Sequence, residues 1–493
     1  MRPVHDVDAI RKAEAAVMAQ LPEGALMQRA ATALARRCAD VLGQVYGARV
    51  VLLVGKGNNG GDALYAGARL AARGARVDAV LLGDAEPPAA LTALLAAGGR
   101  VHRAGTDRDK ALTGAADLVV DGMLGIGGKG ALRGAAARLA KVSAEAGATV
   151  VAVDVPSGVD AGSGRVDGSV VRADVTVTFG ALKPGLLVDP GAAYAGIVEC
   201  VDIGLGPHLP KPQLTVADAD GIAALMPRSQ REMDKYRRGV VGICAGSDTY
   251  TGAAVLSTGG AIAAGVGMVR FVSVAHAAEL VRRRWPEAVV TVVEPGDGAA
   301  VVNSGRVQAW VLGPGLGTDD NAAAVVNEVL RTDVPVIVDA DALTVVAQHR
   351  DWLGTRTAPT VLTPHAGEFA RLCNVDRSDV EAERLAWARR AAADLGATIL
   401  LKGSTTVIAE PDGTARVNPT GTPLLATAGS GDVLSGAVGA LLATGLSALD
   451  AATAAAYLHG MAARLAGAGG AAISATDLIG HWAEAVGTVL LGD

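Results

Sequence analysis

The sequence has few cysteines and few aromatic residues for its length. Its 493 residues include four cysteines, Cys38, Cys200, Cys244 and Cys373, and none of them forms a CxxC pair. This sparsity argues against a zinc site or a disulfide framework and fits a reducing cytosol, so we expect a cytoplasmic protein. Aromatic residues make up 3% of the chain and hydrophobic residues 50%, so Ala, Val and Leu must fill the cores.

The chain also lacks an excess of positive charge and a long membrane-like run. Its net charge of −6 gives no reason to expect a nucleic-acid partner. The basic cluster at residues 228–238 is interrupted by Glu232 and Asp234, and we interpret it as a solvated connection or a rim for a substrate phosphate. The charged N-terminus shows no signal peptide. The uncharged run 433–449 falls short of a membrane span, so we expect no membrane partner and predict a buried helix followed by a turn.

The order of apolar and polar segments predicts two α/β domains. The length suggests about two to four domains. In the first half, helices are predicted at 8–19, 25–41, 63–72, 89–97 and 134–146, and short buried strands at 49–54, 76–82, 117–121, 149–155 and 174–179. In the second half, strands are predicted at 240–244, 268–274, 288–293, 309–312, 335–340, 360–363 and 398–402. Such alternation indicates mostly parallel sheets with helices on both faces. A segment rich in Pro and Gly at 204–212 separates the halves, so we place the domains at 1–210 and 211–493.

A glycine-rich turn near the C-terminus carries the strongest functional signal. Gly429-Ser430-Gly431-Asp432 runs directly into an apolar helical pattern, residues 433–442. Backbone N–H groups at such a helix start would hold an anion, and Asp432 beside them would act as a base, as phosphoryl transfer to a hydroxyl requires. Alternatively, the turn is only a helix start at which Ser430 or Asp432 caps free N–H groups. The stretch alone leaves both interpretations open.

Four further loops in the second half follow predicted strands. They are 313–317, 339–343, 363–368 and 402–406, and each carries glycine or polar side chains. Open α/β sheets bind their ligands at the carboxyl ends of strands, so together these loops indicate a ligand site. Each loop alone is weak evidence for a ligand site, because His365 could be a capping or core histidine and Lys402 could merely flank a strand.

The first half carries two glycine-rich loops and a set of oxygen donors. The loop at 55–62 follows a strand and opens a helix, but the position of its Gly-Lys excludes a Walker A motif. The loop at 125–130 fits GxGxxG weakly and indicates a phosphate-wrapping segment with Lys129 as a counter-charge. Asn59, Asp121 and Ser157 offer oxygen ligands near strand ends, which suit an alkali or alkaline-earth cation. The alternative is that they only cap helices and form Asx-turns.

The motifs of the second half carry a family resemblance. In their order along the chain, these motifs are Gly-Pro-Gly-Leu-Gly, Asp-Ala-Asp-Ala-Leu, Thr-Pro-His-x-Gly-Glu-Phe, Leu-Lys-Gly and Asn-Pro-Thr-Gly…Gly-Ser-Gly-Asp. Together they resemble motifs of the ADP/ATP-dependent NAD(P)H-hydrate dehydratases, which belong to the ribokinase-like superfamily. The resemblance implies that Asp432 is the catalytic base and contacts the substrate together with Ala253, Gly317 and His365. It also implies a nucleotide (ADP/AMP) site formed by Lys402, Gly403, Ser404, Thr405, Thr406 and Gly431. One departure is Asp234-Lys235-Tyr236, where many members have His-Lys-Gly.

The first half resembles a second family. Its motifs are Gly-Lys-Gly-Asn-Asn-Gly-Gly-Asp, Asp-Gly-Met-Leu-Gly-Ile-Gly and Val-Asp-Val-Pro-Ser-Gly-Val-Asp. They are similar to motifs of the NAD(P)H-hydrate epimerases, which have a Rossmann-like fold. The resemblance implies that Asn59, Asp121 and Ser157 bind potassium and that Asp154 handles a proton. It implies substrate contacts at Asn58, Asn59, Gly60, Gly61, Asp62, Gly125, Ile126, Gly127, Gly128, Lys129, Gly130, Ala131 and Asp154.

Together the two resemblances imply repair of hydrated NADH and NADPH (NADHX and NADPHX). The N-terminal half would interconvert the R and S hydrates. The C-terminal half would dehydrate the S form, with ADP as phosphoryl donor accompanied by Mg²⁺, and we expect a homo-oligomer. The alternative is a ribokinase-like kinase for a vitamin precursor or sugar, with the N-terminal half as a non-catalytic binding module.

Overall fold

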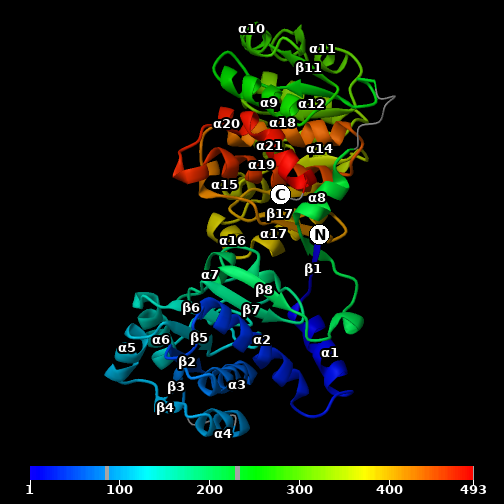
Figure 1. Cartoon of the computed structure of the whole chain (residues 1–493). Helices are drawn as coiled ribbons and strands as arrows, with labels where there is room; N and C mark the ends of the chain where they lie inside the picture. The colour runs from blue at the N-terminus through cyan, green and yellow to red at the C-terminus, as the bar shows by residue number, and fades with distance from the viewer. Residues whose placement is uncertain (84–87, 228–233, 492–493) are drawn as a thin grey trace. The chain divides into compact units, whose positions relative to one another are not determined.

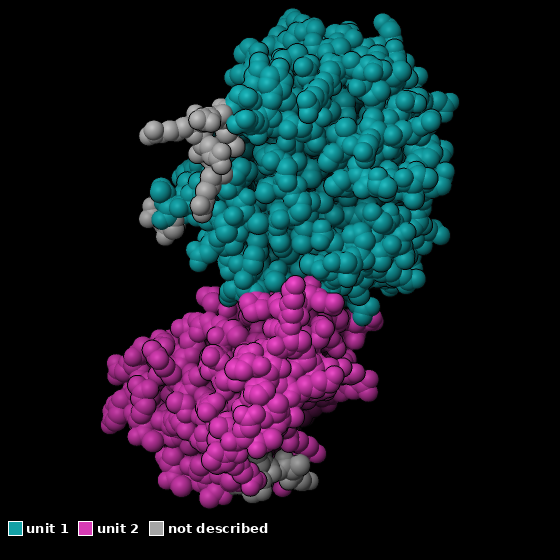
Figure 2. All heavy atoms as spheres, turned by 90° about the vertical axis from the view of Figure 1, so that its right-hand side faces the viewer, with its two compact units in different colours: residues 1–2, 214–493 teal, residues 3–213 magenta. Residues whose placement is uncertain are grey.

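The chain folds into two compact units. The computed structural model describes residues 1–83, 88–227 and 234–491. One unit comprises Pro3–Gln213, and the other comprises Leu214–Asp493 together with Met1–Arg2 (Figure 2). The unit boundary falls just beyond the predicted division at 210/211. The predicted basic cluster lies partly outside the described residues, because 228–233 are among those not described.

The unit Pro3–Gln213 contains a seven-stranded sheet in which every pairing is parallel (Figure 1). The strand order is β4-β3-β2-β5-β6-β7-β8. The strands are β2 Arg49–Val54, β3 Arg76–Leu81, β4 Arg100–Arg103, β5 Leu118–Gly122, β6 Thr149–Val153, β7 Val175–Phe179 and β8 Ile197–Val201. The two edge strands, β4 and β8, were not predicted. Both lack fully buried residues, so neither shows the continuous apolar run that marks the central strands.

Helices cover both faces of this sheet, as predicted. They are α1 Val7–Met18, α2 Ala25–Leu42, α3 Asn58–Ala72, α4 Pro88–Ala96, α5 Asp107–Gly114, α6 Gly134–Glu145 and α7 Ala192–Ala195. Alternate residues of β2 belong to different core clusters. Val50 and Leu52 pack with residues of α1 to α4, whereas Val51 and Leu53 pack with Leu139 of α6. The result is a three-layer αβα arrangement.

The second unit is built on an eleven-stranded sheet of order β1-β9-β18-β17-β16-β15-β14-β13-β10-β11-β12. The strands are β1 Arg2–Val4, β9 Leu214–Val216, β10 Val240–Cys244, β11 Met268–Ser273, β12 Val289–Val292, β13 Ala309–Leu312, β14 Val336–Val338, β15 Thr360–Leu362, β16 Thr398–Leu401, β17 Thr406–Ala409 and β18 Ala415–Asn418. Strands β10 to β16 pair in parallel, whereas β17 is antiparallel to β16 and β18. The hairpin of β17 and β18 was not predicted, although strands of the same length, such as β13, were.

The helices of the second unit are α8 Ala219–Leu225, α9 Thr251–Ala263, α10 Ala275–Arg284, α11 Gly298–Val302, α12 Asp320–Leu330, α13 Ala340–Gln348, α14 Asp351–Gly354, α15 Ala366–Cys373, α16 Arg377–Ala382, α17 Arg384–Leu395, α18 Ser430–Ala443, α19 Ala448–Ala466, α20 Ala475–Gly480 and α21 Trp482–Leu491. Helix α18 is buried from Val433 to Ala443 and packs between α9 and α19. A Cβ on Gly436 would overlap the carbonyl of Ser257, so glycine is required where α18 meets α9. The predicted buried helix is confirmed, and no helix within the described ranges is long and apolar enough to cross a membrane.

Each sheet has one point at which the direction of strand addition reverses. In the first unit β2 lies between β3 and β5, and in the second β10 lies between β11 and β13. Loops that leave the carboxyl ends of two such neighbouring strands diverge and open a crevice. The glycine-rich loops at 55–62 and 313–317 both lie at these points.

Candidate active sites

The start of α18 carries no side-chain cap. Gly429 has φ 88°, in the left-handed region that favours glycine, and within the described part of the chain no side chain caps the start of the helix. Ser430 instead donates from Oγ to the carbonyl of Leu425 at 2.8 Å. The interpretation of Ser430 or Asp432 as a simple cap is therefore wrong. The N–H groups of the first turn, which have no intrahelical acceptor, remain available to an anion.

Asp432 stands in the first turn of α18 in an environment that favours its protonated form. Burial raises its pKa to about 7, the charges of Asp339, Asp341 and Glu368 act in the same direction, and Lys402 opposes them. A carboxylate that takes up a proton near neutral pH is well suited to general-base catalysis.

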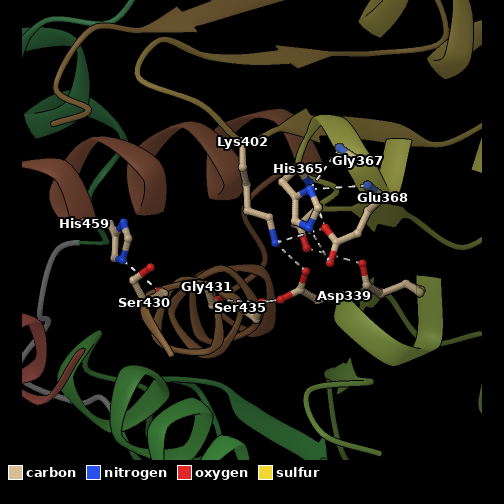
Figure 3. A network of polar contacts seen from close by, with 11 residues as sticks. Asp339, His365, Gly367, Glu368, Lys402, Ser430, Gly431, Ser435 and His459 are labelled. Atoms are coloured by element: carbon tan, nitrogen blue, oxygen red, sulfur yellow. Dashed lines mark hydrogen bonds and ion pairs between the residues drawn. The ribbon is translucent and has the colours of Figure 1, made fainter. Parts of the chain in front are cut away.

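Next to Asp432, a lysine joins the ends of three neighbouring strands (Figure 3). Lys402 follows β16, and its Nζ lies 2.8 Å from Oδ1 of Asp339, which follows β14. The same Nζ lies 3.6 Å from Oε2 of Glu368, in α15 after β15. Ser435 of α18 donates to Oδ2 of Asp339 at 2.5 Å. The Asp339 side chain is thereby bonded at both oxygens and is 1% exposed.

The ion pair between Lys402 and Asp339 determines the protonation state of both side chains. Burial alone would raise the pKa of Asp339, but Lys402 and hydrogen bonds from Ser435 and Thr363 hold that pKa below its usual value. Burial opposes the charge of Lys402, yet Asp339 and Glu368 raise its pKa. Lys402 and Asp339 are therefore both ionised at neutral pH.

The remaining residues of the predicted nucleotide segment form the turn from β16 to β17. Gly403 and Ser404 are exposed, Thr405 is half-buried, and Thr406 is buried at the start of β17. Thr406 donates from Oγ1 to the carbonyl of Gly403 at 3.2 Å. The structure thus separates Lys402, whose side chain points into the network, from the four residues that follow it.

His365 lies in the same group of loops and caps the start of α15 in a capping box with Glu368, which confirms the interpretation of a capping histidine. Its Nδ1 accepts the backbone N–H groups of Gly367 at 3.0 Å and Glu368 at 3.3 Å. Burial lowers its pKa, and in the neutral ring the proton must then be on Nε2. His365 and Lys402 are also bridged through their backbones at the ends of β15 and β16.

The predicted substrate contacts Ala253 and Gly317 lie at the reversal point beside β10. Gly317 donates its N–H to Oδ2 of Asp341 at 2.9 Å and lines a cavity of about 430 Å³. Ala253 is in the first turn of α9, and a Cβ on Gly315 would lie 2.9 Å from the Cβ of Ala253. Sequence reasoning assigned no role to Ser435, because a serine within an apolar helix pattern gives no signal of a site.

In the first unit, a cavity of about 610 Å³ opens at the reversal point between β2 and β5. Of the predicted substrate contacts, it is lined by Asn58, Asn59, Gly125, Ile126, Gly127 and Gly128. Gly60, Gly61 and Asp62 are buried at the start of α3, and Lys129, Gly130 and Ala131 are not among the lining residues. Sequence reasoning missed Arg11 and Glu14, which line the cavity from the distant helix α1.

A buried ion pair forms at the end of β6. Asp154, with φ 67°, holds a left-handed conformation that is uncommon for a residue other than glycine. Its Oδ1 accepts from Nζ of Lys183 at 2.6 Å, from Oγ1 of Thr178 at 3.1 Å and from the N–H of Phe179 at 3.2 Å. Lys183, which sequence reasoning missed, is 1% exposed. The strained backbone and fixed partner hold this carboxylate in one orientation.

Two more carboxyl groups lie within the electrostatic reach of Asp154. Burial raises the pKa of Asp62 to about 8, and the charges of Asp154 and Glu14 add to the effect. Burial and Asp154 also raise the pKa of Glu14, against Lys183 and Arg11. One oxygen of Asp62, Oδ1, is buried with no hydrogen-bond partner within the described chain. The site therefore combines one lysine-paired carboxyl group with two whose pKa values are raised.

Two of the predicted potassium ligands, Asn59 and Ser157, contact the carbonyl oxygen of Leu124, and the third, Asp121, is bonded to Ser157. Asn59 donates from Nδ2 to the carbonyls of Leu124 at 3.2 Å and Val153 at 2.5 Å, and Oγ of Ser157 lies 3.3 Å from the Leu124 oxygen. Asp121 accepts from Oγ of Ser157 at 2.7 Å. A cation among these oxygens would require the Asn59 amide to turn, so that Oδ1 rather than Nδ2 faces the carbonyls.

The chemistry of this donor set fits a hard cation. All the converging groups can offer oxygen, and only Asp121 contributes a full negative charge. Burial raises the pKa of Asp121 to about 6, although hydrogen bonds from Ser157 and Met123 oppose the rise. Among the described residues Asp121 has no basic side chain as an ion-pair partner, so a cation would supply the missing counter-charge. The bond from Met123 is also the Asx-turn of the alternative interpretation.

Comparison with known proteins identifies both halves. Residues 241–482 match the family NAD(P)H-hydrate dehydratase, and residues 23–185 match the family YjeF-related protein N-terminus. The chain is 49% identical over 457 residues to the bifunctional NAD(P)H-hydrate repair enzyme Nnr of Mycobacterium tuberculosis, covering 92% of this chain and 91% of that protein. It is 47% identical over 490 residues to the enzyme of the same name from Mycobacterium leprae, covering 98% of each.

Solved structures confirm the ribokinase-like architecture. The ADP/ATP-dependent NAD(P)H-hydrate dehydratase from Bacillus subtilis, co-crystallised with ATP/Mg²⁺, aligns with a TM-score of 0.52 and 31% identity, covering 56% of this chain and 98% of that chain. A ribokinase-like superfamily protein from Enterococcus faecalis aligns with a TM-score of 0.51 and 26% identity, covering 57% and 98%. The chain therefore belongs to the family of bifunctional NAD(P)H-hydrate repair enzymes.

Proposed function

We propose that this chain repairs hydrated NADH and NADPH. The unit that begins at Leu214 dehydrates the S hydrate with ADP as phosphoryl donor, and the unit Pro3–Gln213 interconverts the R and S hydrates. The observation that carries the proposal is the position of Asp432 in the uncapped first turn of α18. A base and an anion-binding turn at one point are what phosphoryl transfer to a hydroxyl requires.

In the dehydratase unit, Asp432 takes the proton of the ring hydroxyl as its oxygen attacks the β-phosphorus of ADP. The new O–P bond forms while the bond from phosphorus to the bridging oxygen breaks, and AMP leaves. The N–H groups at the start of α18 stabilise the transferring group. ADP arrives as its magnesium complex, in which phosphates and water supply most of the metal ligands.

Phosphorylation turns hydroxide, a poor leaving group, into phosphate, a good one. The lone pair of the ring nitrogen then expels phosphate from the neighbouring carbon, and loss of a proton from the next carbon restores the ring double bond. The products are NADH or NADPH, phosphate and AMP. Because the proton of His365 is on Nε2, this side chain serves as a donor to the nicotinamide carboxamide and not as the base.

In the epimerase unit, Asp154 handles the proton at the hydrated carbon. Its ion pair with Lys183, at 2.6 Å, fixes the position of this carboxyl group. Asn59, Asp121 and Ser157 hold potassium, which would fix the loop after β5 against the loop after β6 and offset the charge of Asp121. Potassium is supported by the all-oxygen donor set and by the lack of a basic partner for Asp121 among the described residues.

Two further aspects remain predictions. A cytoplasmic location is supported by the small number of cysteines and by the lack of a CxxC pair in the sequence. Assembly into a homo-oligomer is expected from the Ala-rich helices, and sedimentation velocity would test it.

Product analysis tests the dehydratase against the vitamin-kinase alternative. The purified S hydrate of NADH is incubated with MgADP, and NADH absorbance, AMP and phosphate are followed together. We expect all three in equal amounts, and Asp432→Asn should abolish them while Asp351→Asn, at an exposed position of α14, should not. A phosphorylated hydrate that persists without NADH would instead support a kinase.

A further inference from the structure

Lys402 is a basic group among four carboxyl groups. It forms ion pairs with Asp339 and Glu368, and Asp432 adds to the electrostatic rise of its pKa. Asp341 raises the pKa of Asp432 from the same side. A nucleotide phosphate entering this cluster would meet mainly negative charge, so the ammonium group of Lys402 decides whether the phosphate can bind.

The head of Lys402 lies over the first turn of α18. A Cβ added to Gly431 would lie 3.5 Å from Nζ of Lys402, and Figure 3 shows the side chain descending toward this turn. The backbone N–H of Lys402 donates to the carbonyl of Pro364 at 2.9 Å, which ties the residue to the end of β15. An anion held by the N–H groups of Gly431 and Asp432 would therefore also contact this ammonium group.

Asp339 and Ser435 fix the position of this ammonium group. Asp339 uses Oδ1 for Lys402 and Oδ2 for Ser435. The Oγ of Ser435 also lies 3.0 Å from the carbonyl of Gly431, so it links Asp339 to the first turn of α18. An ammonium group has three N–H donors, and the hydrogen bond to Asp339 occupies one of them, whereas Glu368 lies at the longer distance of 3.6 Å. A further donor can therefore point at a phosphate oxygen.

We propose that Lys402 is a catalytic residue of phosphoryl transfer, contacting the β-phosphate of ADP at the start of α18, with Asp339 and Ser435 as its positioning residues. This inference rests on the proposed function. It assigns Lys402 a contact with the transferred phosphoryl group, whereas sequence reasoning placed it only in the segment that binds the nucleotide. Lys402 stays protonated throughout. The hydroxyl proton goes to Asp432, the electron pair of the broken P–O bond stays on AMP, and the ammonium stabilises the charge on the phosphoryl oxygens.

Binding of ADP and AMP to the full chain separates a β-phosphate contact from a contact with the rest of the nucleotide. Calorimetry would compare the wild type with Lys402→Met, Lys402→Arg and the control Lys211→Met, an exposed lysine outside the dehydratase unit. We expect Lys402→Met to weaken ADP binding about 10-fold and to leave AMP binding unchanged, with part of the loss restored in Lys402→Arg. Unchanged AMP binding also shows that the variant is folded.

Kinetics with the S hydrate supply the second readout. Lys402→Met should lower kcat by about 10²-fold or more, which is the scale for loss of one preorganised donor. Ser435→Ala should lower kcat by a smaller factor, with little change in the KM for ADP. Equal losses of ADP and AMP affinity, or an unchanged kcat in Lys402→Met, would overturn the inference. If the wild type regenerates no NADH but the ADP-specific loss is seen, the proposed function fails and the phosphate contact stands.

Discussion

The ammonium group of Lys183 lies 2.6 Å from Oδ1 of Asp154, 29 residues earlier in the chain, and both side chains are almost completely buried. The pair joins the end of β6 to the segment after β7. A buried charge that loses its partner is far more costly than an intact pair, so this contact makes the epimerase site and the stability of its unit depend on the same two residues.

Lys183→Met should destabilise the first unit by about 3–5 kcal/mol, because it leaves the carboxylate of Asp154 buried without a counter-charge. The double variant with Asp154→Asn should lose less. All five tryptophans lie in the second half of the chain, so their fluorescence reports on the dehydratase unit. Hydrogen exchange in β5 to β7 would follow the first unit. Equal losses in the single and double variants would contradict the role of the pair.

Asp62 should make the first unit less stable as the pH rises. Its pKa is about 8 in the folded chain against an ordinary value of 3.8, so between these values the unfolded chain is ionised while the folded chain keeps the proton. Stability then falls by up to about 1.4 kcal/mol per pH unit across this window. Above about pH 6, the pKa of Asp121, the slope should come mainly from Asp62, so Asp62→Asn should reduce it there. Urea unfolding at pH 6.5 and pH 8, followed by circular dichroism, would measure the change, and a slope in this range that is equal in the variant and the wild type would refute this assignment.

Potassium should stabilise the first unit through Asp121. A ligand that binds only the folded state raises stability with its concentration, so the unfolding temperature of this unit should rise as KCl replaces tetramethylammonium chloride at constant ionic strength. The rise should be absent in Asp121→Asn, whose neutral amide removes the only full charge of the donor set. Equal responses of the two proteins would count against this site.

Dehydration should accelerate as the pH rises toward neutrality. Asp432 acts as a base only when ionised, and its pKa is about 7 in the absence of ligands, so log(kcat/KM) should rise with pH and level off above about 7. Asp432→Asn should lower kcat by about 10²–10⁴-fold, the usual contribution of a general base. A rate that is flat from pH 5 to pH 8 would argue against Asp432 as the base.

Much of this structure could be predicted from short sequence motifs, because neighbouring residues determine buried strands and glycine-rich turns. Buried strands such as β2 and β13 appear as continuous apolar runs, and the Gly429–Asp432 turn placed an acidic residue at a helix start. The cluster Asn59, Asp121 and Ser157 was also anticipated, since parallel strands bring their carboxyl ends together.

What the sequence did not reveal depends on contacts between distant segments. Lys183 and Glu14 look like ordinary residues of a loop and a helix, and only the folded chain places them near Asp154. Ser435 lies within an apolar helix pattern, and its bond to Asp339 bridges 96 positions. The role of Lys402 was similarly hidden, because its chemistry depends on a side chain that points away from the four residues following it.

Recovery of NADH from a mixed preparation of the R and S hydrates tests the central claim most directly. With MgADP and potassium, and after subtraction of the slow uncatalysed epimerisation, the wild type should convert both hydrates to NADH. Asp154→Asn should stop near the S fraction, and Asp432→Asn should give none. Recovery by the wild type that stalls at the S fraction would remove the epimerase from the account, and no recovery with either ADP or ATP would contradict the repair function as a whole.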